Sequence, residues 1–227
     1  MSQAQVWSIA AGDDGVETRA IYDPAGDSIA EIVYIMAHGA GGNMEHKTMA
    51  AFAHQFTHKS GFDVVRFNFP YTHRGRHAPD RMPKLMACYR RVIEEVRSEL
   101  TPKTLLIGGQ SMGGRAASML AAEGEGCDGL ILLAYPLHPA GKEDRLRDAH
   151  LKDISVPTLC FNGTRDALCK RELMEQVVAG LSERFRMHWL EGADHGYHVL
   201  KKSGRTQHEV LAEVADVSCQ WAAQFIA

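Results

Sequence analysis

The chain has 227 residues, of which 45% are hydrophobic and 23% are charged, and its formal net charge is −3. This length and composition are typical of a soluble globular protein with one sizeable core, and we expect a single domain over residues 1–227. The charge gives no electrostatic reason to expect nucleic acid or an acidic membrane as a partner. No apolar run is long enough to cross a bilayer, so we expect no membrane partner.

Three further features of the composition concern compartment and cofactors. Residues 1–5 lack the basic start and the apolar block of a secretory signal. The five cysteines form no Cys-x-x-Cys pair, and we expect reduced thiols in a cytoplasmic protein. The 12 histidines include no His-Glu-x-x-His motif, and the sequence predicts neither a metal nor another cofactor.

The predicted strands and helices alternate along the chain. In chain order, apolar patterning predicts strands at 5–10, 16–22 and 31–37, a helix at 45–59, a strand at 62–69, a helix at 83–100 and a strand at 104–108. It then predicts a helix at 113–122, strands at 129–135 and 156–162, a helix at 171–181, a strand at 185–190 and a helix at 207–225. Asp13-Asp14-Gly15 supplies the turn of the opening hairpin. This alternation predicts an α/β fold with a mostly parallel sheet and helices on both faces.

A Gly-x-Ser-x-Gly motif, Gly109-Gln110-Ser111-Met112-Gly113, lies between a predicted strand and a predicted helix. This placement is typical of a nucleophile elbow, a sharp turn on which a serine sits at strained backbone angles. Bulky side chains two positions before and after the serine would collide with the neighbouring strand and helix, so both positions need glycine. The motif also occurs by chance in glycine-rich loops, and the order of its partners along the chain tests the prediction.

A carboxylate and a histidine follow the serine in the order that α/β-hydrolases use. Asp166 comes after the strand at 156–162, and His195 lies on a loop after the strand at 185–190. Active-site groups of open α/β sheets collect at the carboxyl ends of strands, so we expect both residues to meet Ser111 there. Asp194 is the rival acid, but sequence neighbours in a loop usually point apart, which favours Asp166.

A glycine-rich loop at residues 38–42 follows the strand at 31–37. Such a loop lets backbone amides approach a reacting oxygen closely. We expect an oxyanion hole built from the amide of Met112, directly after the nucleophile, and one amide of this loop. Ala40 is the first choice for the second donor and Gly41 is the next. The alternative is that the loop is an ordinary tight turn between a strand and a helix.

Two segments without regular patterning, residues 71–82 and 136–142, lie at the expected active-site edge. Long irregular loops at such an edge tend to carry function. The interval between the strands at 129–135 and 156–162 is too short for a large helical cap, so we expect an open site. The predicted substrate contacts, from these segments and from the elbow helix, are Tyr71, Arg74, Arg76, Arg115 and His138.

Arginines near the site mouth raise the hypothesis of an anionic substrate, because a guanidinium pairs a planar anion with two hydrogen bonds. The hypothesis depends most on Arg115, one turn into the elbow helix. The alternative is that the arginines are solvated or form structural pairs with Asp80, Glu143 or Asp144.

Landmark stretches run from about residue 31 to the C-terminus, at residues 38–41, 66–71, 109–115, 135–139, 145–151, 157–159, 163–166 and 194–195. In these stretches the chain resembles the small, capless α/β-hydrolases near the dienelactone hydrolases. It is similar in particular to a group of predicted hydrolases that includes a scaffold subunit of the animal non-specific lethal acetyltransferase complex. The resemblance implies an α/β-hydrolase fold without a large cap domain, and a triad of Ser111, Asp166 and His195.

We expect a serine hydrolase that cleaves small carboxylic esters or thioesters through an acyl-enzyme on Ser111. The alternatives are acyl transfer or peptide-bond cleavage on the same triad, and a non-catalytic scaffold with this fold. The expected partner is a small-molecule acyl substrate, and the expected assembly is a monomer or a homodimer.

Overall fold

The computed structural model describes residues 3–12 and 16–225, so the turn expected at residues 13–15 lies outside the described residues. In the described part of the chain, the strands are β1 (Gln5–Ala10), β2 (Glu17–Asp23), β3 (Ile32–Ala37), β4 (Asp63–Phe67), β5 (Thr104–Gln110), β6 (Gly129–Leu133), β7 (Thr158–Gly163) and β8 (Phe185–Leu190). They form one sheet in the order β1-β2-β4-β3-β5-β6-β7-β8. The pairs β1–β2 and β2–β4 are antiparallel, and the other pairs are parallel.

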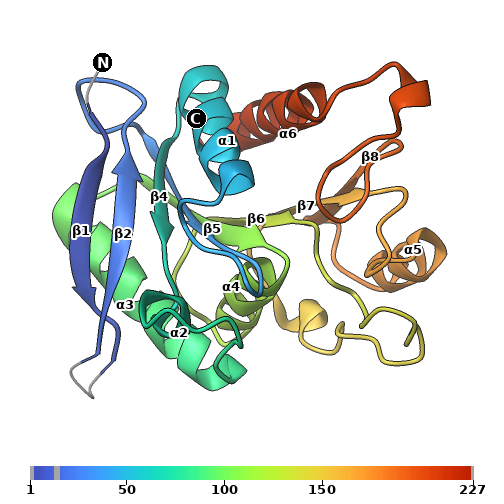
Figure 1. Cartoon of the computed structure of the whole chain (residues 1–227), viewed down its shortest axis with the longest axis horizontal. Coiled ribbons are helices and arrows are strands. Elements are labelled where there is room, and N and C mark those ends of the chain that lie inside the picture. Colours follow the sequence, from blue (N-terminus) through green and yellow to red (C-terminus); the bar gives the residue numbers. More distant parts are fainter. Residues whose placement is uncertain (1–2, 13–15, 226–227) are drawn as a thin grey trace.

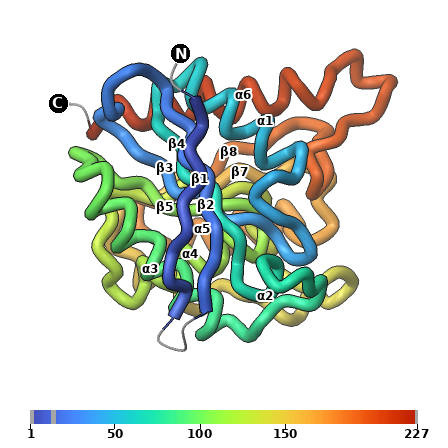
Figure 2. Tube along the Cα trace, turned by 60° about the vertical axis from the view of Figure 1, so that its left-hand side comes forward, coloured from blue at the N-terminus to red at the C-terminus, as the bar shows by residue number. Residues whose placement is uncertain are grey.

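Helices cover both faces of this sheet (Figure 1). The α-helices of the described residues are α1 (Lys47–Gln55), α2 (Pro70–His73), α3 (Met82–Leu100), α4 (Met112–Ala122), α5 (Arg171–Ala179) and α6 (Gln207–Ala222). Helices α1 and α6 pack on one face and α3 and α4 on the other, and the turned view in Figure 2 shows the same two layers. The prediction of a mostly parallel sheet flanked by helices on both faces is confirmed.

The central strands are buried along their whole length. Every residue of β3, β4, β6 and β7 is buried, as expected for parallel strands that helices cover on both faces. The hydroxyl of Tyr89 in α3 lies 2.8 Å from the carbonyl oxygens of Ile35 and Gly108 and accepts the Gly108 amide at 2.9 Å. This contact ties α3 to β3 and β5 directly before the predicted elbow.

The strand order reverses at β3, because the chain leaves it for β4 on one side and later returns for β5 on the other. The loops after β3 and β5 therefore lead to helices on opposite faces, and open α/β sheets bind ligands where loops diverge in this way. Between β6 and β7 all residues are described, and their regular structure is a single 3-10 turn, Leu151–Asp153. The expectation that no large cap domain covers the site is thereby confirmed.

Two segments differ from the predicted elements. The helix expected at 45–59 is α1 followed by a π-helical turn, Phe56–Ser60, and the chain leaves it at Gly61 with a left-handed φ of 68°. The stretch 71–82 is expected to lack regular structure, but its start belongs to α2. Pro70 occupies the first position of this short helix, where its fixed φ favours a helical start.

The described residues bear on the expectations about membranes and metals. They contain no helix that is long and apolar enough to cross a membrane. The same residues hold no group of three or more His, Cys, Asp or Glu side chains arranged to bind a metal ion. All five cysteines are free thiols.

Candidate active site

Ser111 stands on the sharp turn between β5 and α4. Its backbone has φ 52° and ψ −114°, outside the regions that residues with side chains ordinarily adopt. Its amide donates to the carbonyl of Leu133 in β6 at 2.8 Å. A Cβ at Gly109 or Gly113 would lie 2.2 or 2.4 Å from the carbonyl oxygen of Ala37. The backbone of β3 therefore passes so close to this turn that only glycine fits at both positions.

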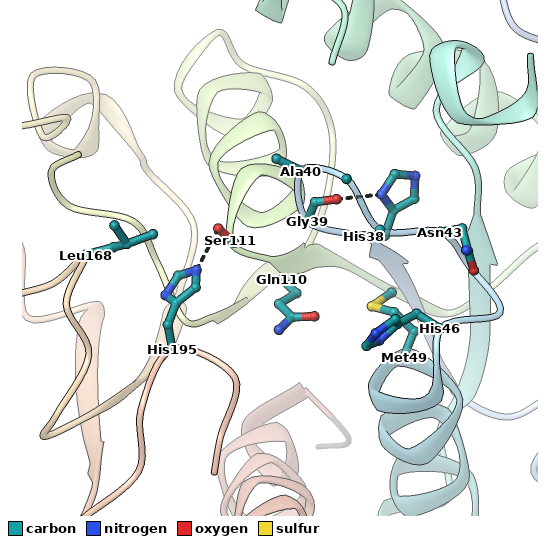
Figure 3. Close-up of a pocket in the computed structure, with 12 residues that line it drawn as sticks. His38, Gly39, Ala40, Asn43, His46, Met49, Gln110, Ser111, Leu168 and His195 are labelled. Carbon is teal, nitrogen blue, oxygen red and sulfur yellow. Dashed lines mark hydrogen bonds between the residues drawn. The ribbon is translucent and has the colours of Figure 1, made fainter. Parts of the chain in front are cut away.

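One row of hydrogen bonds joins the serine, the histidine and the carboxylate. Nε2 of His195 lies 2.9 Å from Oγ of Ser111 (Figure 3), and Nδ1 lies 2.9 Å from both carboxylate oxygens of Asp166. The Asp166 side chain is fully buried, whereas the His195 side chain is 29% exposed. A proton held on Nδ1 by the carboxylate leaves Nε2 free to accept the serine proton.

Two further donors fix the Asp166 carboxylate. The side chain of Asn162 donates to Oδ2 at 3.0 Å, and the amide of Leu168 donates to Oδ1 at 2.8 Å. Asn162 is held in turn by the backbone of Tyr135, with its Nδ2 on the carbonyl at 3.0 Å and its Oδ1 on the amide at 3.2 Å. A buried charge is tolerated when its oxygens are paired in this way. Asn162 was not among the residues predicted from the sequence, where its signal is a polar residue near the end of a buried strand.

Asp194, the rival acid, serves its own loop. Its Oδ1 accepts the amides of Gly196 and His198, both at 2.9 Å, and lies 3.4 Å from Nδ1 of the His198 ring. These contacts close a tight turn after β8. The structure therefore brings Asp166, and not Asp194, to the ring of His195.

The glycine-rich loop after β3 lies beside the nucleophile, where Ala40 and Gly41 line one pocket. The Gly41 amide donates to the hydroxyl of Tyr71 at 3.3 Å. In the described part of the chain, the Ala40 amide has no hydrogen-bond partner. Met112 is the first residue of α4, where amides have no partner within the helix. Of the two predicted loop donors, Ala40 is therefore the one whose amide is available.

His38 holds the base of this loop. Its Nε2 accepts the amide of Phe69 at 3.1 Å, and its Nδ1 lies 2.8 Å from the carbonyl oxygen of Gly39 (Figure 3). Burial lowers the pKa of His38 to about 4, against a smaller upward effect of the hydrogen bond to Gly39. The imidazole is therefore neutral near pH 7, with its proton on Nδ1, and it joins the loop to the end of β4.

Two pockets meet at Ser111. The first has a volume of about 400 Å³ and contains His195 and the glycine-rich loop (Figure 3). The second has a volume of about 360 Å³, lies toward α3 and α4, and contains Arg115 and Arg147. Three residues line both pockets: Ala40, Ser111 and Leu168.

The three arginines predicted to contact substrate lie in different surroundings, and only one of them lines a pocket beside Ser111. Arg115 lines the second pocket. Arg74 and Arg76 line neither pocket, and their guanidinium groups lie 3.7 and 3.8 Å from the carboxylate of Asp80. For Arg74 and Arg76 the predicted substrate contact is therefore wrong, and the alternative of a structural pair with Asp80 holds.

Tyr71 and His138, the other predicted substrate contacts, have backbone partners. Tyr71 is fully buried and its hydroxyl accepts the Gly41 amide. Nδ1 of His138 lies 3.0 Å from the carbonyl oxygen of Pro139, and its Nε2 accepts the Lys170 amide at 3.1 Å. His138 faces a separate pocket of about 570 Å³ on the other side of the acid. The structure brings neither side chain to Ser111.

Known proteins share this architecture. Residues 30–223 match the alpha/beta hydrolase domain family. A serine hydrolase without a lid from Xanthomonas campestris superposes with a TM-score of 0.76 at 22% identity, over 97% of this chain and 96% of that chain. An alpha-beta serine hydrolase homologue from Coxiella burnetii gives 0.76 at 19% identity, over 96% and 98% of the two chains.

A dienelactone hydrolase from Anabaena variabilis gives a TM-score of 0.74 at 19% identity, over 98% of this chain and 97% of that chain. At such identities the solved structures show a shared fold. Because the family match covers most of the chain, this protein belongs to the alpha/beta hydrolase domain family.

Proposed function

We propose that this protein is a serine hydrolase that cleaves small carboxylic esters or thioesters through an acyl-enzyme on Ser111. The observation that carries the proposal is the hydrogen-bonded row from Ser111 through His195 to Asp166, with 2.9 Å at each contact. Membership of the alpha/beta hydrolase family supports hydrolysis as the class of reaction.

In the first half-reaction, Oγ of Ser111 attacks the carbonyl carbon of the ester. His195 takes the hydroxyl proton on Nε2 while the new carbon–oxygen bond forms, and Asp166 stabilises the imidazolium. The tetrahedral intermediate collapses when His195 gives this proton to the leaving oxygen or sulfur. An alcohol or thiol departs, and the acyl group remains as an ester on Ser111.

In the second half-reaction, water takes the place of the serine hydroxyl. His195 removes a proton from the water as its oxygen attacks the acyl carbon, and then returns that proton to Oγ of Ser111. The carboxylic acid leaves and the free serine is restored. The 29% exposure of the His195 side chain gives water access to the acyl-enzyme, which favours hydrolysis over transfer to another acceptor.

We assign the oxyanion hole to the amides of Met112 and Ala40. Both residues line the second pocket beside Ser111, and the Gly41 amide is engaged by Tyr71. In comparable sites each such donor contributes about 3 kcal/mol of transition-state stabilisation. The positive end of α4 points at the same space and adds to this effect.

Other functions could use the same fold. Acyl transfer and peptide-bond cleavage would run on the same three residues, and the resemblance to a scaffold subunit suggests a non-catalytic role. The backbone of Ser111 favours catalysis, because a scaffold has no physical need for a serine at φ 52°. Backbone strain at a single residue is typically retained at active sites, where it positions a reacting group.

The test is intact mass spectrometry after incubation with a fluorophosphonate probe, with Ser111→Ala as the control. We expect a single adduct on the native protein and none on the variant, because the probe labels activated serines. Turnover of p-nitrophenyl acetate and of an acetyl thioester is measured in parallel, and thermal melting checks the fold. A well-folded native protein that takes no adduct and cleaves neither ester contradicts the proposal and leaves the scaffold role.

A further inference from the structure

We infer that the acyl half of the substrate carries a carboxylate, which binds Arg115 and Arg147 in the second pocket beside Ser111. The inference rests on the proposed serine hydrolase function and names its substrate class. That class is the half-esters or half-thioesters of dicarboxylic acids, cleaved at the esterified end. Three observations lead to it: the position of His195 in the first pocket, two guanidinium groups without an ion pair among the described residues, and the apolar wall of the second pocket.

The position of His195 decides which pocket takes which half of an ester. His195 lines the first pocket and does not line the second. Because it must give a proton to the leaving oxygen, the leaving group lies on its side of the carbonyl carbon. The acyl chain then extends the other way, into the second pocket between α3, α4 and the segment after β6.

Arg115 enters this pocket with unused hydrogen-bonding capacity. Its Nε is buried and has no hydrogen-bond partner among the described residues, although buried polar and charged groups are ordinarily paired. Arg147 lines the same pocket and donates from Nη1 to the carbonyl of Pro136 at 3.4 Å, a long hydrogen bond. In the described part of the chain, neither guanidinium forms an ion pair.

The two guanidinium groups are close enough to repel each other. Burial, and then the charge of Arg115, lowers the pKa of Arg147. His150 adds no charge beside them, since burial and Arg115 lower its pKa to about 4. Its Nε2 lies 2.8 Å from Oγ of Ser118. An anion between the two arginines would offset their repulsion, and guanidinium groups bind carboxylates through paired hydrogen bonds.

Asp80 is the acidic residue on the wall of this pocket, and it faces other cations. Its carboxylate lies 3.7 Å from Arg74 and 3.8 Å from Arg76. Those two charges offset its own, although one of its oxygens is buried without a hydrogen bond. The charge that remains in the pocket is the positive charge of Arg115 and Arg147.

The remaining wall of the pocket is apolar. Met82 and Leu85 from α3 and Pro136 after β6 line it, within a volume of about 360 Å³. Methylene groups between the reacting carbonyl and a distal carboxylate would contact these side chains. Apolar contact along the chain and charge at its end together select a half-ester over a short neutral acyl group.

Matched esters test the inference by kinetics. Ethanol release from monoethyl glutarate and monoethyl adipate is compared with release from the ethyl methyl diesters, in which the carboxylate is masked. We expect kcat/KM in the native protein to favour the free carboxylate by about tenfold or more, as a charged hydrogen bond implies. Arg115→Gln and Arg147→Gln should each reduce this ratio by about tenfold.

Arg145→Gln is the matched control, because it removes the same charge from an exposed position that lines neither pocket. It should keep the native ratio. Equal kcat/KM for free and masked esters in the native protein overturns the inference. An equal loss of the ratio in Arg145→Gln also overturns it, because the effect would then be long-range charge and not a bound carboxylate.

A binding measurement separates this inference from the proposed catalysis. In the Ser111→Ala variant, calorimetric titration with monoethyl adipate should show saturable binding, and Arg115→Gln in the same background should abolish it. If the native protein cleaves no ester but this binding is observed, the proposed catalysis fails while the carboxylate site stands. Binding that is absent from Ser111→Ala, or that survives the loss of Arg115, overturns the site.

Discussion

The Gly41 amide donates to the Tyr71 hydroxyl at 3.3 Å, so one of the two oxyanion donors predicted in the glycine-rich loop is already engaged. Tyr71 is fully buried, and its ring lies 6.0 Å from that of His38, which holds the start of the same loop. His38 therefore holds the start of the loop, and Tyr71 holds it at Gly41. Ala40 lies between His38 and Gly41, and its amide has no hydrogen-bond partner in the described part of the chain, as the proposed oxyanion hole requires.

Tyr71→Phe tests this arrangement, because it removes the acceptor and keeps the ring. We expect the free energy of unfolding to fall by about 1 kcal/mol, the contribution of one hydrogen bond. We expect kcat to fall a few fold while KM stays within about twofold, since the loop loses order and no substrate contact is lost. Steady-state kinetics and urea denaturation measure both effects. A higher kcat in Tyr71→Phe would show instead that the released Gly41 amide is the second oxyanion donor.

The two candidate acids, Asp166 and Asp194, make a second prediction. Asp166→Asn should lower kcat by about 10³- to 10⁴-fold, because an amide cannot hold the His195 ring in the required tautomer. Asp194→Asn should change kcat by less than about threefold, since its oxygen serves the backbone of its own turn. Both variants are assayed on the same ester and melted to check folding. The reverse ranking would identify Asp194 as the acid in solution.

The close approach of β3 to the elbow makes a third prediction. A Cβ at Gly113 would lie 2.4 Å from the Ala37 carbonyl oxygen, so Gly113→Ala must push strand and helix apart. We expect a loss of about 1–3 kcal/mol in the free energy of unfolding and slower labelling by fluorophosphonate. Gly26→Ala is the control, because a Cβ there meets nothing within 4 Å and should cost less than about 0.5 kcal/mol. Equal stability of the two variants would contradict the steric argument.

Much of this fold was predictable from short-range patterns. Apolar runs located the central strands to within a few residues, because a strand covered on both faces is apolar throughout. The meeting of Ser111, Asp166 and His195 was predicted from the Gly-x-Ser-x-Gly motif, from the order of the three residues along the chain and from the topology of the sheet. Parallel strands end at one edge of the sheet, so residues placed directly after β5, β7 and β8 come together there.

Contacts between irregular segments were not predictable in this way. The side chain of Asn162 is held by hydrogen bonds to the backbone of Tyr135, 27 residues earlier, and no periodicity of the sequence links the two. Arg147 lies in an irregular stretch and reaches the second pocket through the course of that loop. Arg74 was expected to contact substrate, but the turn after α2 directs it to Asp80. Such contacts depend on loop paths, which the sequence pattern does not encode.

The histidine in the glycine-rich loop makes the last prediction, which concerns pH. Burial lowers the pKa of His38 from 6.5 to about 4 in the folded protein. Between these two pH values the unfolded chain binds a proton that the folded chain does not, so stability rises with pH there. The stabilisation from neutral His38 is complete above pH 6.5 and declines as the pH falls toward 4. For this one group the decline amounts to roughly 2–3 kcal/mol.

Urea denaturation between about pH 7 and pH 4.5 measures the effect. His38→Gln should be less stable than the native protein near pH 7, because its amide replaces the two ring contacts imperfectly. Its free energy of unfolding should nevertheless fall less steeply with decreasing pH, since the buried titrating group is gone. His150, whose pKa is also lowered to about 4, keeps part of the slope in both proteins. His73→Gln, at an exposed position, should reproduce the native slope. If His38→Gln and the native protein instead gave parallel curves, His38 would have to be protonated in the folded state, and its Nε2 could not accept the Phe69 amide at low pH.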